Sequence, residues 1–147
     1  MQANISLLQN MSFLNGLRGM WKNKPDLNSL WSVPDQYSDI EYLFKPNAGV
    51  AVIYKHSFSC GVSIFAKTRL EESLDTLAKH AELVFVDVKQ NRTISNKIAK
   101  KTGVRHESPQ VLVMHKGEVY WHGSHNRVQA GVVNEAIHEI TGKTMAT

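Results

Sequence analysis

The chain has 147 residues, a length typical of one domain that can bury a hydrophobic core. Apolar residues make up 42% and charged residues 20%, as in globular rather than disordered proteins. No stretch approaches the ~20 apolar residues of a membrane span. The net charge of +4 comes from scattered lysines and arginines, so neither a membrane nor a nucleic acid is expected as a partner. A single cysteine excludes an internal disulfide and is compatible with a reducing compartment.

Residues 1–35 are interpreted as an N-terminal extension whose function the sequence does not indicate. No positive charge precedes its first apolar residues, which argues against a secretory signal. Residues 1–25 carry no acidic side chain, so an organelle transit peptide stays open as an interpretation. Trp21 and Trp31 suggest that the extension covers either the domain or a partner.

The domain itself is predicted over residues 36–142. Its first element is a short helix with Ser38 and Glu41 as a capping box. Apolar runs rich in β-branched residues predict four strands, at 50–54, 83–88, 109–114 and 119–121. Helical spacing predicts helices at 62–78, with a kink at a second capping box over 68–71, at 94–102 before Gly103, and after Asn126 as N-cap.

The order of these elements is α-β-α-β-α-β-β-α. Strands separated by helices pair in parallel through right-handed crossovers, and the tight turn at 115–118 adds an antiparallel hairpin. We therefore expect an α/β fold with a mixed four-stranded sheet flanked by helices, which is the arrangement of thioredoxin-like folds.

Cys60 is the main candidate for chemistry, because it lies where a buried strand has ended and a helix begins. Unpaired N–H groups and the helix dipole stabilise a thiolate at such a place. Ser63 completes a C-x-x-S arrangement, and its hydroxyl is expected to bond the thiolate, while Lys55 is expected to add positive potential. The alternative is that Cys60 only packs, as most free cysteines do.

Pro109 is the second clue, since a proline that opens an apolar strand is unusual unless it lies at an edge or its peptide bond is cis. A cis-proline faces the active cysteine in thioredoxin-like folds. Ser108 would then offer its backbone to a bound disulfide, as one rung of a strand does. Ser124, His125 and Asn126 precede the last helix and form a candidate site for a carboxylate.

Together these motifs resemble the monothiol bacilliredoxins. The resemblance covers residues 36–140, and it rests on the motifs K-H-S at 55–57, C-G-V-S at 60–63 and G-V-R-H-E-S-P-Q at 103–110, with Trp121 and S-H at 124–125. It implies a bacterial cytoplasmic setting, Cys60 as the catalytic residue and Pro109 as the cis-proline. The chain departs from the family at Gly61, where proline is common.

The resemblance further implies bacillithiol as co-substrate, no tightly bound cofactor, and bacillithiolated client proteins as partners. Cys60 would take bacillithiol from a client, and an external low-molecular-weight thiol would regenerate it. Two alternatives stay open, namely an iron–sulfur cluster carrier and a non-catalytic interaction module. No spacing typical of a metal site exists among the histidines, so no metal is expected.

Overall fold

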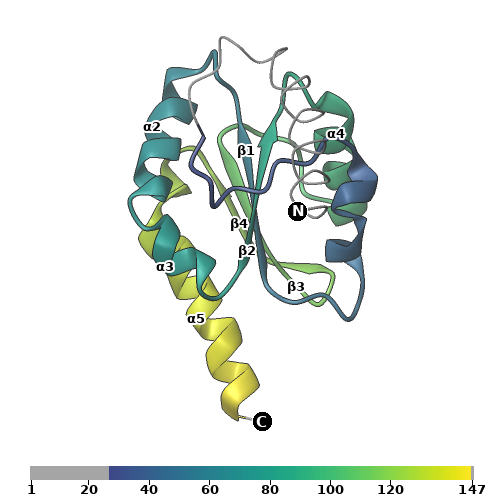
Figure 1. Cartoon of the computed structure of the whole chain (residues 1–147), viewed down its shortest axis with the longest axis vertical. Coiled ribbons are helices and arrows are strands. Elements are labelled where there is room, and N and C mark those ends of the chain that lie inside the picture. The colour runs from purple at the N-terminus through teal and green to yellow at the C-terminus, as the bar shows by residue number, and fades with distance from the viewer. Residues whose placement is uncertain (1–26, 147) are drawn as a thin grey trace, which may run out of the picture.

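The computed structural model describes residues 27–146 (Figure 1). Two short 3-10 turns, Tyr37–Asp39 and Glu41–Phe44, come first, and a third, His125–Arg127, precedes the last helix. The strands are β1 (Ala51–His56), β2 (Glu82–Asp87), β3 (Gln110–His115) and β4 (Glu118–Ser124). The helices are α2 (Gly61–Glu71), α3 (Leu74–Ala78), α4 (Arg92–Thr102) and α5 (Ala130–Ala146).

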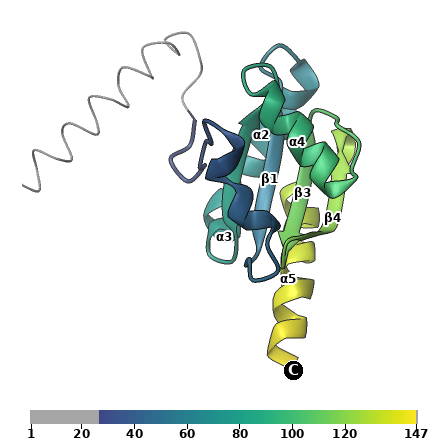
Figure 2. The same cartoon turned by 90° about the vertical axis from the view of Figure 1, so that its right-hand side faces the viewer.

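The four strands form one mixed sheet in the order β2-β1-β3-β4. β1 and β2 are parallel, whereas β3 pairs antiparallel with both β1 and β4. Helices α2, α3 and α5 cover one face, and α4 with the first two 3-10 turns covers the other (Figures 1 and 2). The predicted fold class, a mixed four-stranded sheet flanked by helices, is therefore confirmed.

β1 lies at the centre of the sheet and is buried along its whole length. Successive side chains of a strand point to opposite faces. Val52 and Tyr54 accordingly join the core cluster beneath α2, α3 and α5, while Ala51 and Ile53 join the cluster beneath α4. By the same alternation, Lys55 near the end of β1 points to the α4 face, and His56 points to the face of Tyr54.

The last described part of the extension packs onto this domain. Trp31 is only 6% exposed and belongs to the core cluster under α2, and its indole N–H donates to Glu71 at 3.0 Å. Ser32 forms a parallel bridge with Val84 at the outer edge of β2. The expectations for residues 1–26, including Trp21, lie outside the described residues.

Two predicted capping boxes are wrong. The first turn is capped by Gln36 with Asp39, not by Ser38 with Glu41, and it is a 3-10 turn. The second box, over 68–71, is absent, because the Thr68 hydroxyl donates to the Ile64 carbonyl within α2 at 3.1 Å and does not cap a new helix. The break instead falls between the end of α2 and the start of α3.

The start of the last helix also differs from the prediction. Asn126 is not its N-cap, because β4 runs to Ser124 and a 3-10 turn follows, so that α5 begins at Ala130. His125 has a positive φ of 54°, a conformation that no sequence pattern for an N-cap implies. Gly103 does end α4 in the left-handed region, with φ 74°, as predicted.

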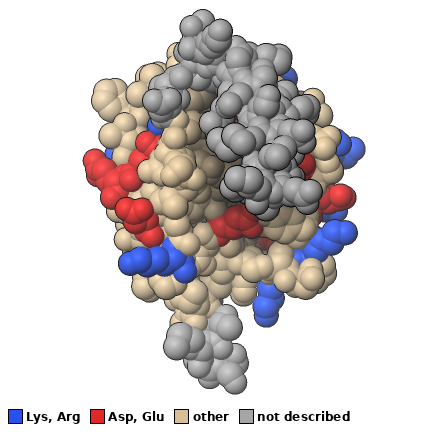
Figure 3. All heavy atoms as spheres, in the orientation of Figure 1, with Lys and Arg blue, Asp and Glu red and all other residues tan. Residues whose placement is uncertain are grey.

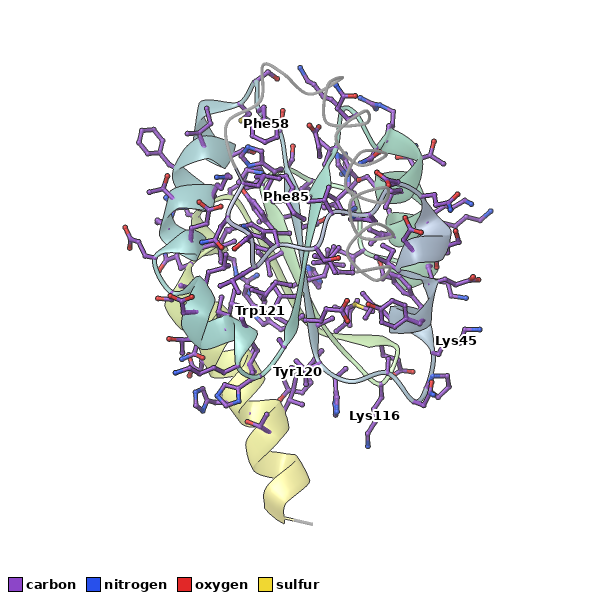
Figure 4. The ribbon with its side chains drawn as sticks, viewed as in Figure 1. Lys45, Phe58, Phe85, Lys116, Tyr120 and Trp121 are labelled. Atoms are coloured by element: carbon purple, nitrogen blue, oxygen red, sulfur yellow. The ribbon has the colours of Figure 1, made fainter. Side chains whose placement is uncertain are left out.

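The β3–β4 hairpin turns at Lys116 and Gly117, both with positive φ. This turn lies against the loop before β1, where the Lys116 N–H donates to the Ala48 carbonyl at 3.1 Å, and Figure 4 shows Lys116 near Lys45. Across residues 27–146, no helix is both long enough and apolar enough to cross a bilayer. Charges of both signs are interspersed over the face in Figure 3.

Candidate active site

Cys60 is the N-cap of α2, with extended backbone (φ −111°, ψ 118°). A turn brings it there, because the Cys60 N–H donates to the Ser57 carbonyl at 3.2 Å directly after β1. The first helical bond runs from the Ile64 N–H to the Cys60 carbonyl at 3.2 Å. The cysteine is partly exposed, which separates it from a cysteine that merely packs in a core.

The helix start lowers the pKa of the Cys60 thiol. The largest cause is the backbone N–H of Ser63, followed by that of Val62, while partial burial opposes them. The Ser63 hydroxyl adds a smaller effect in the same direction. Ser63 Oγ is buried and finds no partner of ordinary hydrogen-bond geometry in residues 27–146.

Lys55 does not occupy the place expected for it. Its fully buried side chain lies on the α4 face, where the ammonium donates to the Ser95 carbonyl at 3.1 Å. It is not among the groups that shift the pKa of Cys60. The expectation for Lys55 is therefore not supported, because a residue next to the end of a strand can lie on the opposite face from the helix that follows.

Phe58, in the turn that leads to Cys60, is a residue of the site that the sequence did not predict. It is partly buried and its ring lies 4.3 Å from the His56 ring and 5.9 Å from the Phe85 ring, centre to centre. Figure 4 shows Phe58 and Phe85 at the end of the sheet from which the turn to α2 starts. The available signal was a large apolar residue inside an otherwise polar turn.

The peptide bond between Ser108 and Pro109 is cis. In the β1–β3 register Lys55 pairs with Gln110, so Pro109 extends β3 at the sheet end where β1 turns toward Cys60. The Pro109 carbonyl accepts a hydrogen bond from the His125 N–H at 3.0 Å. The structure thus brings the predicted residues Ser108 and Pro109 beside the segment 124–126.

Ser124 is already engaged by an acidic side chain, because its hydroxyl donates to the Glu107 carboxylate. This bond is the largest of the causes that lower the pKa of Glu107, and His125, Arg105 and His122 act in the same direction. The role of segment 124–126 in binding a carboxylate of a ligand stays a prediction. The Ser124 hydroxyl already donates to a carboxylate of the protein itself, and the Asn126 side chain is exposed beyond the turn.

An apolar patch follows Cys60 along α2. Val62 is 47% exposed, Ile64 49% and Phe65 70%, although α2 buries Ala66 and Leu70 against the sheet. Val62 and Phe65 are three residues apart and so lie on one side of the helix, and neighbouring exposed apolar side chains are typical of interaction surfaces.

The histidines predicted near the hairpin lie in different places. His115 lines a hollow of about 550 Å³ with His80 and His138, whereas His125 lies beside Pro109. Residues 27–146 contain no group of three or more histidine, cysteine or carboxylate side chains placed to hold a metal ion.

Comparisons with known proteins agree with this geometry. The sequence pattern of the family described as "Monothiol bacilliredoxin BrxC" matches residues 35–133. A solved structure described as a candidate oxidoreductase with a thioredoxin fold is 27% identical, with a TM-score of 0.63 over 73% of this chain and 93% of that one.

Two thioredoxins share the fold at lower identity. The Malassezia sympodialis protein is 17% identical, with a TM-score of 0.60 over 80% of this chain and 96% of its own. The Fasciola hepatica protein is 20% identical, with a TM-score of 0.56 over 73% and 96% respectively. With a thioredoxin-like fold, a thiol of lowered pKa at a helix start and a family match over most of the domain, the chain belongs to the monothiol bacilliredoxin family.

Proposed function

We propose that this protein removes bacillithiol from protein mixed disulfides by a monothiol mechanism through Cys60. Its family and its oxidoreductase fold give it a thiol redox function. The observation that carries the proposal is the partly exposed Cys60 at the N-terminus of α2, with its thiol pKa lowered by the N–H groups of Ser63 and Val62. A lowered pKa raises the fraction of thiolate at neutral pH, and the thiolate is the nucleophile.

The Cys60 thiolate attacks the bacillithiol sulfur of the client's mixed disulfide. A new disulfide forms between Cys60 and bacillithiol, the old one breaks, and the client sulfur leaves as a thiolate with the electron pair. A second molecule of bacillithiol, as its thiolate, then attacks the bound bacillithiol sulfur. Bacillithiol disulfide is released and the Cys60 thiolate is restored, so two thiols supply the electrons that reduce the client.

The cis-proline loop supplies the surface on which the disulfide is aligned. Because Pro109 has no N–H and its carbonyl is bonded to His125, the backbone of partly exposed Ser108 is the group left to bond an extended substrate. The basic side chains around Glu107, from Arg105, His122 and His125, attract the carboxylates of bacillithiol. We propose a bacterial cytoplasm, where such clients are kept reduced, as the place of action.

The test uses a model client that carries one bacillithiolated cysteine, incubated with the full chain and excess bacillithiol. We expect release of the client thiol, and intact mass spectrometry of the protein should show one bacillithiol adduct on Cys60. Cys60→Ser abolishes both, because serine is not nucleophilic at neutral pH, whereas Ser59→Ala at the exposed neighbouring position retains both. Client release by Cys60→Ser at the wild-type rate would refute the proposal.

A further inference from the structure

A buried polar chain lies under the first turn of α2. The Tyr54 hydroxyl donates to the Ser63 carbonyl at 2.9 Å, and the same oxygen lies 2.9 Å from Nδ1 of His56. Both Tyr54 and His56 come from β1 and are fully buried. The proposed exchange reaction uses neither side chain directly.

The direction of these hydrogen bonds follows from the chemistry of the groups. A backbone carbonyl can only accept, so the single proton of the Tyr54 hydroxyl goes to Ser63. The bond to His56 must then run from its Nδ1–H to the Tyr54 oxygen. One directed chain therefore leads from the imidazole of His56 through Tyr54 to the backbone of Ser63.

Aromatic packing fixes both rings. The His56 ring lies 4.3 Å from that of Phe58 and 5.3 Å from that of Phe85, and the Tyr54 ring lies 5.6 Å from Phe85 and 5.8 Å from Trp31. Interiors packed in this way leave side chains few alternative rotamers. The Tyr54 hydroxyl is consequently held at one place beneath the helix.

Ser63 links this buried chain to the reactive sulfur. Its N–H is the strongest of the groups that stabilise the Cys60 thiolate, and its carbonyl is the acceptor for Tyr54. A bond that anchors the Ser63 carbonyl also limits the movement of the Ser63 N–H. Donors that stabilise a charge act best when they are held in place before the charge forms.

We propose that Tyr54 is a positioning residue, oriented by His56, that keeps the N–H groups of the first turn of α2 directed at the Cys60 sulfur. This inference rests on the proposed role of Cys60 and deepens it. The other charged groups that face the pair are Glu71 and Arg69 of α2, which act on Tyr54, and Asp87 of β2, which is paired with His56 in the sheet.

The state of Tyr54 agrees with this role. Burial raises its pKa far above the ordinary value for tyrosine, and the nearby Glu71 and Cys60 raise it further against the opposing effect of Arg69. The hydroxyl therefore keeps its proton throughout the range in which the thiol ionises. It stays a donor to the Ser63 carbonyl after Cys60 has become a thiolate.

The test measures the rate at which iodoacetamide alkylates Cys60 in the full chain, as a function of pH. Tyr54→Phe keeps the ring and removes the hydroxyl, so we expect the rate at pH 6 to fall about two- to fivefold, the effect of one lost hydrogen bond. The rate at pH 10, where the thiol is fully ionised, should stay unchanged. A role limited to general stability would not move the pH profile in this way.

Two further variants complete the test. His56→Asn places an amide donor near the position of Nδ1 and should keep the wild-type profile, whereas His56→Leu should resemble Tyr54→Phe. Tyr120→Phe is the matched control, because its hydroxyl donates to Glu139 at 2.8 Å on α5 and should leave the profile unchanged.

A profile of folded Tyr54→Phe that superimposes on the wild type, with near-UV circular dichroism showing intact packing, would overturn the inference. Failure of the proposed function is distinguishable from this. In that case the shift in the alkylation profile persists, and bacillithiol release from a client is absent in the wild type as well.

Discussion

Replacing Lys55 with methionine is expected to stabilise the protein at pH 7. The Lys55 side chain is fully buried, and its ammonium makes one hydrogen bond, to the Ser95 carbonyl. Burial lowers its pKa from 10.5 to about 8, and no carboxylate of residues 27–146 counteracts this shift. At pH 7 the folded protein therefore holds the Lys55 cation in a buried environment that disfavours the charge.

The size of the effect follows from the two pKa values. A fall from 10.5 to about 8 corresponds to roughly 3 kcal/mol of free energy lost by the folded state at pH 7. Methionine fills a similar volume but loses the hydrogen bond to Ser95, which is worth about 1 kcal/mol. We expect the free energy of unfolding of Lys55→Met to exceed that of the wild type by about 1–2 kcal/mol.

The gain should depend on pH in a defined direction. The pKa of Lys55 is lower in the folded state, so the unfolded chain binds the proton more tightly between pH 8 and 10.5. Wild-type stability therefore rises relative to that of the variant through this window, and the advantage of the variant disappears toward its upper end. Urea unfolding followed by tryptophan fluorescence, from pH 7 to 10.5 with a reductant present, measures the difference.

Lys100→Met is the control, because this exposed lysine also lies on α4's side of the sheet and its replacement should give a difference that does not change with pH. The reasoning is refuted if Lys55→Met is less stable than the wild type at pH 7. It is equally refuted if the difference between the two proteins stays constant up to pH 10.5.

Three other substitutions test separate features. Phe65→Ser should slow exchange with a protein mixed disulfide severalfold and leave the rate with a small disulfide unchanged, because a small substrate does not reach the exposed apolar patch. Glu107→Gln should lower KM for a bacillithiol mixed disulfide, because it removes the carboxylate that engages the Ser124 hydroxyl. Gly117→Ala should lower the free energy of unfolding by about 1–3 kcal/mol, since φ is +81° there and a Cβ would meet the Lys45 carbonyl oxygen at 2.7 Å.

For each substitution, a control substrate or a control variant distinguishes the predicted effect from a general loss of folding. A neutral mixed disulfide, such as one with 2-mercaptoethanol, should show no change in KM for Glu107→Gln. Gly49→Ala, where a Cβ meets nothing within 4 Å, should leave the urea midpoint nearly unchanged. Equal slowing of Phe65→Ser with small and protein substrates would contradict a docking role for that ring.

The sequence was sufficient for the fold class because the four strands and the helices between them carried local signals, although several helix boundaries were predicted wrongly. The β-branched run of β1 and Gly103 at the end of α4 depend on local preferences that tertiary structure did not override. The position of Cys60 at the start of α2 followed from the order of strand, polar turn and helix.

The site was less predictable where long-range pairing decides. A strand buried on both faces has no alternation of polar and apolar residues. The local sequence therefore does not indicate that Lys55 points to α4 and His56 toward α2. Likewise β4 continues to Ser124 because it pairs with Gln110, which displaced the start of the last helix. The packing of Trp31 depends on the edge of β2, which its own neighbours in the sequence do not reveal.

The adjacency of Lys55 and His56 at the end of β1 also protects the fold against misregistration. Because the two faces of a strand alternate residue by residue, sliding β1 by one position would exchange them. The lysine would then lie on the face that His56 now shares with Phe85, and the Tyr54 hydroxyl would turn away from the Ser63 carbonyl. A register slip of one residue in β1 is thus destabilising for two reasons: a lysine cation is placed among apolar rings, and a buried tyrosine hydroxyl loses its acceptor.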